Sequence, residues 1–231
     1  MYGAIELGGT KICCGVGPNA EELLANTTIE TRDPEATLAE VFEFLDNAQN
    51  EFGSIQALGV ASFGPVDLNH SSATYGSILT TPKLGWSHCN LLDAMSAHLS
   101  VPISITTDVN AALLAEHRYG AARGVDNAIY VTVGTGVGAG VMVNGHLVNG
   151  FLHPEVGHMR VPTYGVEGIC PFHKDCLEGL ASGPAIQARA GQPAHEIPDD
   201  DPIWDEIALN LADLCNNLVM TLATERIVFG G

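Results

Sequence analysis

The pattern of apolar and polar positions divides the 231-residue chain into alternating strands and helices. Apolar runs of strand length occur in six places: 4–16 (two short strands about a turn), 55–63, 101–106, 128–133, 141–143 and 225–231. Apolar residues at helical spacing predict helices at about 34–50, 89–99, 107–119, from 183 onward, and 204–222. Residues 68–87 are rich in Asn, Ser, Gly and Pro and predict a loop. Strands interleaved with helices are typical of an α/β fold.

Composition and charge narrow the possible partners. Hydrophobic residues make up 46% of the chain, which is enough for a well-buried core, and 27 acidic against 9 basic residues give a net charge of −18. A chain this acidic repels nucleic acid and anionic membranes, so we expect neither as a partner. The N-terminus lacks the features of a signal peptide, and no apolar run reaches the length of a membrane span.

The cysteines point to a reducing compartment. Cys13 and Cys14 are adjacent in an expected strand, where neighbouring side chains face opposite sides. That is a poor framework for disulfides, so the simplest location is the cytoplasm.

Two glycine-rich turns suggest phosphate binding. Gly8-Gly9-Thr10-Lys11 lets a ligand approach the backbone closely, although it lacks Walker A spacing and an ordinary hairpin turn is the alternative. Residues 134–140 place four glycines among small residues before an expected strand. Their G-x-G-x-G-x-G spacing, followed by a strand and not a helix, argues against a dinucleotide-binding site.

Polar residues follow two of the expected strands. Gly64-Pro65-Val66-Asp67 forms a turn after one strand, and Asp108 stands where the next strand gives way to a helix. Ligands of open α/β sheets bind at the carboxyl ends of strands. Asp108 has two possible roles, which are compatible: it could cap the helix, or it could act as a general base.

A dense group of metal ligands lies downstream. Cys170, His173 and Cys176 have C-x2-H-x2-C spacing, and His158 is the nearest good candidate for a fourth ligand. Mixed thiolate and imidazole ligands suit Zn²⁺. Four protein ligands would leave no open position, so we expect a structural ion and not a catalytic one.

Taken together, these motifs resemble the ROK family (repressor, open reading frame, kinase), and within it the zinc-containing bacterial fructokinases. The similarity runs from Ile5 to Gly231 and includes Gly8–Lys11, Ala61–Pro65, Thr107–Ala112, Val133–Gly138, His153–His158 and Cys170–Pro184. The resemblance implies an actin-like ATPase (ribonuclease H-like) fold with two lobes around an ATP and sugar cleft. We expect the lobes to comprise residues 1–109 and 110–231.

The resemblance also assigns residue roles. Asp108 would be the catalytic base. The ATP phosphates and nucleotide would meet Gly8, Gly9, Thr10, Lys11, Gly134, Thr135, Gly136, Gly138 and Gly230. The sugar would meet Gly64, Pro65, Asn110, Glu155, His158 and Glu178, with His158 also joining the sugar site to the zinc. Zinc would be held by His158, Cys170, His173 and Cys176.

Two positions depart from the family pattern. Glu6 stands where many relatives have Asp, and it would hold Mg²⁺ through water. His173 replaces a thiolate, as in the fructokinase-like branch. The chain stops on an apolar strand at Gly231, so we expect the full protein to continue.

The implied activity is Mg²⁺- and ATP-dependent phosphorylation of a hexose, with fructose converted to fructose 6-phosphate. Alternatives are a glucokinase, a mannokinase or an N-acetylhexosamine kinase of the same family. A sugar-sensing repressor fits less well, because the regulatory members carry a DNA-binding segment ahead of the Gly8–Lys11 strand and this chain begins at that strand. Family members are commonly dimers, so we expect a homodimer.

Overall fold

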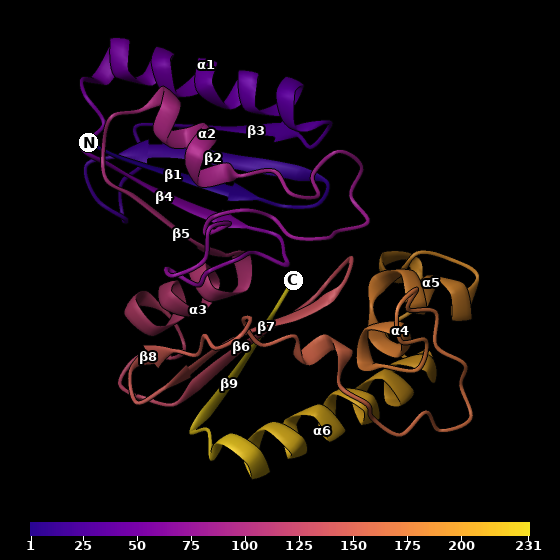
Figure 1. Cartoon of the computed structure of the whole chain (residues 1–231). Helices are drawn as coiled ribbons and strands as arrows, with labels where there is room; N and C mark the ends of the chain where they lie inside the picture. The colour runs from indigo at the N-terminus through magenta and orange to yellow at the C-terminus, as the bar shows by residue number, and fades with distance from the viewer. The chain divides into compact units, whose positions relative to one another are not determined.

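The computed structural model describes residues 1–231, and the chain forms two compact units, coloured in chain order in Figure 1. Unit 1 comprises Met1–Ala111 and Asn149–His153, and unit 2 comprises Ala112–Val148 and Pro154–Gly231. These units are defined by packing, and the domain boundary between residues 109 and 110 stays a prediction. None of the helices combines the length and apolar character that a membrane crossing requires.

Unit 1 is built on a five-stranded sheet in the order β3-β2-β1-β4-β5. The strands are β1 (Tyr2–Leu7), β2 (Lys11–Gly17), β3 (Ala25–Glu30), β4 (Ala57–Ser62) and β5 (Ile103–Thr107). The first three form an antiparallel meander, whereas β4 and β5 run parallel to β1. Helix α1 (Pro34–Phe52) packs on β2 and β3, and α2 (Leu91–His98) packs on β5 (Figure 1).

Local sequence accounts for these elements. Strand β1 alternates exposed and buried residues, with Ile5 and Leu7 in the core, as a half-buried strand should. Helix α1 starts at Pro34, and the Asp33 side chain accepts a hydrogen bond from the amide of Ala36 at 2.9 Å. Its buried face is an apolar stripe at helical spacing that covers the sheet.

Unit 2 is built on a four-stranded sheet in the order β8-β7-β6-β9. The strands are β6 (Ala128–Val133), β7 (Val137–Val143), β8 (His146–Leu147) and β9 (Arg226–Gly230). Strands β6, β7 and β8 are antiparallel neighbours, and β9 runs parallel to β6. The helices are α3 (Asp108–Tyr119), which starts in unit 1, then η1 (Val156–His158), α4 (Leu177–Ala181), α5 (Gly183–Ala190), η2 (Ala194–Glu196) and α6 (Ile203–Leu222).

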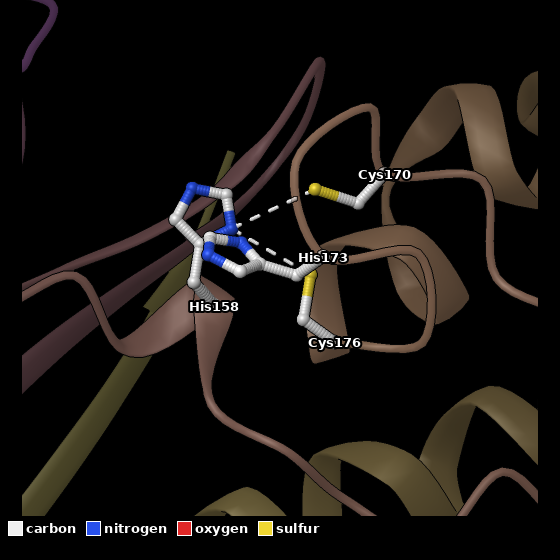
Figure 2. A group of neighbouring side chains, drawn as sticks. All are labelled: His158, Cys170, His173 and Cys176. Carbon is white, nitrogen blue, oxygen red and sulfur yellow. Dashed lines mark hydrogen bonds between the residues drawn. The ribbon is translucent and has the colours of Figure 1, made fainter.

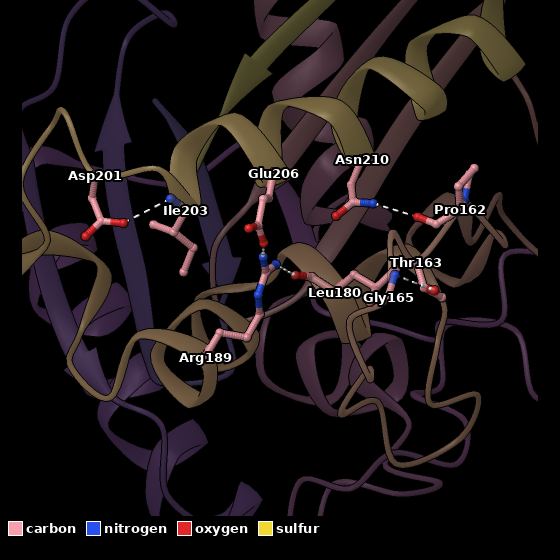
Figure 3. A network of polar contacts seen from close by, with 9 residues as sticks. All are labelled: Pro162, Thr163, Gly165, Leu180, Arg189, Asp201, Ile203, Glu206 and Asn210. Carbon is pink, nitrogen blue, oxygen red and sulfur yellow. Dashed lines mark hydrogen bonds and ion pairs between the residues drawn. The ribbon is translucent and has the colours of Figure 1, made fainter.

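Helix α6 anchors the helical part of unit 2 through polar contacts (Figure 3). Arg189 of α5 pairs with Glu206 of α6 and also donates to the carbonyl of Leu180 in α4 at 3.0 Å. On the next turn, Asn210 donates to the carbonyl of Pro162 at 2.9 Å. One long helix therefore holds α4, α5 and the loop that follows η1.

The two sheets share one topology. Strand order, and the direction of each strand relative to its neighbours, are the same in β3-β2-β1-β4 and in β8-β7-β6-β9. Each unit therefore places a tight turn between two antiparallel strands beside the carboxyl end of a parallel strand.

Several elements differ from the sequence-based prediction, including the short β8, η1, α4 and η2, which were not predicted. Strand β3 was not predicted, because Ala25–Glu30 is largely polar and buries only Ile29. Strand β7 begins at Val137, so the expected turn over 134–140 was too long and its last glycines lie in the strand. Small residues fit there because Gly138 lies opposite Thr132 and Gly140 lies opposite Tyr130 in the sheet.

Candidate active site

The register of the parallel strands brings the expected catalytic residues of unit 1 to one edge. Leu7 of β1 pairs with Ser62 of β4, and Ser62 pairs with Thr107 of β5. The three strands therefore end in line, and the Gly8 turn, the Gly64–Pro65 turn and Asp108 each follow directly. This is the edge at which ligands bind open α/β sheets.

The first glycine turn is held by backbone bonds. Gly8 donates to the carbonyl of Lys11 at 2.9 Å, and the hydroxyl of Thr31 donates to the carbonyl of Gly8 at 2.8 Å. Gly9, Thr10 and Lys11 are exposed at the tip. An added Cβ at Gly8 would stand 2.7 Å from the carbonyl oxygen of Lys11, so the turn requires glycine there.

Asp108 has the electrostatics of a base poised near neutral pH. Burial raises the pKa of its carboxyl to about 6, and the nearby charge of Glu6 adds to the rise, while a hydrogen bond from the amide of Val109 at 2.8 Å opposes it. The i-to-i+3 capping bond of α3 comes from another residue, because the hydroxyl of Thr107 accepts from the amide of Asn110 at 3.2 Å. The capping role considered for Asp108 is therefore filled by its neighbour.

Asn110 is fully buried and donates to the hydroxyl of Thr106 at 3.2 Å. Its side-chain oxygen has no hydrogen-bond partner, which is costly for a buried amide. This burial suits a role in holding the residues around Asp108 better than the direct contact with a sugar that was expected for Asn110. Glu6 is exposed on β1, as a residue that binds water around a metal ion needs to be.

The second glycine turn is fixed by a carboxylate. The amide of Val137 donates to Glu178 Oε2 at 3.1 Å, and the same oxygen lies 2.7 Å from where a Cβ on Gly136 would be. The amide of Gly183 donates to the carbonyl of Gly134 at 2.8 Å. Glu178 was expected to grip the sugar. In the structure, Glu178 supports the turn that is expected to meet phosphate. Thr135 is exposed at the tip of this turn.

The four expected metal ligands come together, as Figure 2 shows. One ligand atom from each of His158, Cys170, His173 and Cys176 lies within 4.8 Å of the others. His158 Nδ1 is 3.8 Å from the sulfur of Cys170 and 3.5 Å from that of Cys176. Ligands around a tetrahedral zinc at ordinary bond lengths are about 3.5 Å apart, so the donor set and its spacing fit that ion.

Without a bound cation, the cluster disfavours ionisation of the Cys176 thiol. Burial raises the pKa of the Cys176 thiol, and the neighbouring Cys170 raises it further. A bound divalent cation would reverse that effect by stabilising both thiolates.

The cluster and the second glycine turn belong to one packed region of unit 2. Glu178 follows Cys176 by two residues and reaches the turn directly. A Cβ on Gly157, one residue before His158, would stand 1.8 Å from the carbonyl oxygen of Val137, so η1 lies flat against β7. Glu155 sits at the start of η1.

Gly230 ends the parallel strand beside β6 and pairs with Thr132. It therefore lies at the same sheet edge as the turn that begins at Gly134. A Cβ on Gly230 would stand 2.2 Å from the hydroxyl of Tyr130, so packing alone already requires glycine there.

Sequence patterns did not predict the support given to these turns. The bond from Val137 to Glu178 joins residues 41 positions apart, and a bond from Val66 to His153 joins residues 87 apart. The only sequence signal for these contacts was glycine itself. Gly64, Gly136 and Gly157 stand where another part of the chain packs too closely for a side chain.

The same four-strand topology occurs in both units, and each copy has a glycine turn and polar groups at the carboxyl edge. This arrangement defines a protein of the actin-like ATPase class. The loop that carries the four candidate metal ligands narrows the class to one family. The chain belongs to the ROK family, whose sequence profile matches residues 2–231.

Curated relatives support the same family. A fructokinase of Lactococcus lactis subsp. cremoris is 40% identical over 234 residues, covering 100% of this chain and 78% of the relative. A fructokinase of Zymomonas mobilis is 40% identical over 238 residues, covering 100% of this chain and 79% of the relative.

Solved structures agree with the fold. A ROK hexokinase from Thermus thermophilus is 27% identical with a TM-score of 0.80, covering 100% of this chain and 81% of that one. A ROK family glucokinase from Streptomyces griseus, solved with glucose and AMPPNP, has a TM-score of 0.80 at 24% identity, covering 100% of this chain and 82% of that one.

Proposed function

We propose that the protein transfers the γ-phosphoryl group of ATP to fructose, giving fructose 6-phosphate and ADP. The proposal rests on the register of β1, β4 and β5, which end at the same edge of the sheet. Asp108, the Gly8 turn and the Gly64–Pro65 turn therefore share that edge. The fructokinases that match the whole chain at about 40% identity indicate the sugar.

Asp108 is proposed as the general base. With a pKa of about 6 it is mostly ionised at neutral pH, yet basic enough to accept a proton from the attacking sugar hydroxyl. A positioned base of this kind contributes about 10²- to 10⁴-fold to the rate. The remaining requirement of phosphoryl transfer is charge stabilisation, which the amides of the two glycine turns and the cation of Lys11 would supply.

Two metal ions belong to the proposal. Mg²⁺ would enter with ATP and neutralise charge on the phosphates, with Glu6 binding its water. Zn²⁺ would be held by the four-ligand cluster as a structural ion. Since Glu178 lies two residues after Cys176 and bonds the amide of Val137, the ion would fix the second glycine turn as well as the residues expected at the sugar.

Other functions in the family have weaker support. A glucokinase of Streptomyces coelicolor is 29% identical over 84% of this chain and 60% of the relative. A xylose repressor of Bacillus subtilis is 31% identical over 68% of this chain, but that match covers only 41% of the repressor. The carboxylate set does not by itself separate fructose from glucose, mannose or an N-acetylhexosamine. A cytoplasmic homodimer stays a prediction.

The test is a coupled assay of ADP release by the full-length protein with fructose, glucose, mannose and N-acetylglucosamine at saturating Mg-ATP. We expect the highest kcat/KM with fructose. The matched control is Asp108→Asn, which should lower kcat by at least about 10²-fold. A higher kcat/KM for another hexose would replace fructose as the substrate, and turnover unaffected by Asp108→Asn would remove that residue from its role.

A further inference from the structure

A short segment of the chain, Asn149–His153, packs with unit 1 although unit 2 flanks it in sequence on both sides. Its last residue, His153, is a buried polar side chain with only 7% of its surface exposed. The imidazole of a buried histidine needs defined partners, because an unsatisfied polar group in the interior is costly. The hydrogen-bond partner of His153 therefore indicates its role.

His153 holds the turn that follows β4. Its Nε2 accepts a hydrogen bond from the amide of Val66 at 3.2 Å, within a buried environment. A Cβ on Gly64 would stand 3.1 Å from His153 Cε1 and 3.2 Å from Nε2, so the imidazole lies directly against the turn. The acceptor role requires an unprotonated Nε2, with the ring proton on Nδ1.

The same turn is tied at one end to β1 and at the other end to the loop that contains Leu79. The amide of Phe63 donates to the carbonyl of Leu7 at 2.8 Å, beside the first glycine turn. The amide of Leu79 donates to the carbonyl of Pro65 at 2.7 Å. Between these bonds, the amide of Val66 has His153 as its partner. The side chain therefore completes the support of Gly64 and Pro65.

We propose that His153 is a positioning residue for the hexose: it fixes the Gly64–Pro65–Val66 turn in the conformation that the sugar meets. The proposal rests on the proposed kinase function and adds a residue that acts through the turn without touching the reacting atoms. A loosened turn would weaken sugar binding while leaving the ATP-binding turns and the metal cluster in place.

The main test compares His153→Leu, which removes the acceptor at similar volume, with His153→Gln, whose Oε1 can accept from Val66. The control is His195→Ala, because His195 is an exposed histidine outside the site. We expect His153→Leu to raise the KM for fructose about tenfold, the equivalent of one lost buried hydrogen bond, with the KM for ATP and the zinc content unchanged. His153→Gln should recover most of the loss, and His195→Ala should behave like the wild type.

A second measurement follows the turn itself. Hydrogen exchange at the amide of Val66 should be slow in the wild type and in His153→Gln, and faster in His153→Leu. If the leucine variant does not fold, His153→Asn carries the same comparison, since its shorter amide does not reach Val66.

The outcomes separate the two proposals. A wild-type protein inactive on every hexose refutes the kinase function and, with it, the role in sugar binding. An active wild type whose fructose KM is unchanged by the loss of the acceptor refutes the role of His153 alone. A parallel rise of both KM values with loss of zinc would also refute it, because the histidine would then be a general structural residue.

Discussion

The raised pKa of Asp108 predicts that this proposed catalytic base destabilises the fold when it is ionised. The carboxyl has an ordinary pKa of 3.8 and one of about 6 in the folded protein. Between these values the folded state binds more protons than the unfolded state, so stability falls as the pH rises through this window. Above about pH 6 the cost of ionising the buried group is complete, and below about pH 4 it is absent.

Asp108→Asn should therefore raise stability at pH 8 while abolishing most activity. The pKa difference corresponds to about 3 kcal/mol as an upper bound, and partial exposure of the side chain reduces this to about 1–3 kcal/mol. The amide oxygen of asparagine can still accept the hydrogen bond from Val109. For a chain of this size the gain amounts to an increase in Tm of about 2–12 °C.

The assay is thermal unfolding of both proteins by circular dichroism at several values between pH 4 and pH 8. The control is Asp67→Asn, because hydrogen bonds from Ser72 and Thr74 lower the pKa of that partly exposed carboxyl, so its removal should not stabilise the protein at high pH. The reasoning fails if the Asp108 variant melts at or below the wild-type temperature at pH 8. It also fails if the difference in Tm is independent of pH.

The remaining predictions concern the pH profile, the metal and the turns. The acid limb of the profile of kcat/KM should fall near pH 6, since the base must be ionised; a flat profile from pH 5 to 8 would contradict this. Chelation of zinc, or Cys176→Ser, should lower the Tm and raise the KM for ATP together, which calorimetry and kinetics on metal-verified samples can check. Glu178→Gln should raise the KM for ATP about threefold to tenfold, whereas normal ATP kinetics would show that its bond to Val137 is dispensable. Gly157→Ala should lower the Tm by several degrees, because its Cβ would stand 1.8 Å from a backbone oxygen; a wild-type Tm would show that η1 can shift.

Much of the fold could be predicted from apolar periodicity. The helix expected at 34–50 is α1 (Pro34–Phe52), and the helix expected at 204–222 is α6 (Ile203–Leu222), because both carry continuous apolar stripes. Strand β3 escaped prediction because an edge strand with one buried residue has almost no apolar pattern. The start of β7 was misplaced because alternating glycines resemble a turn more than a strand.

The candidate site was predictable where its residues are close in sequence. The candidate metal ligands Cys170, His173 and Cys176 lie within one short loop, and their spacing alone favoured convergence. The contacts from Glu178 to Val137 and from His153 to Val66 were not predictable, because they depend on how distant segments pack. Spacing identifies ligands within a loop, whereas the groups that support the loop come from tertiary structure.

The discontinuity of unit 1 has a consequence for protein synthesis. Because Asn149–His153 packs with Met1–Ala111, the first unit is incomplete when the ribosome has made only its first 111 residues. The amide of Val66 gains its imidazole partner only after the first three strands of the second sheet have been translated. A fragment cut at residue 111 should expose that turn to solvent, so split versions of the gene would need to carry the later segment with the earlier one.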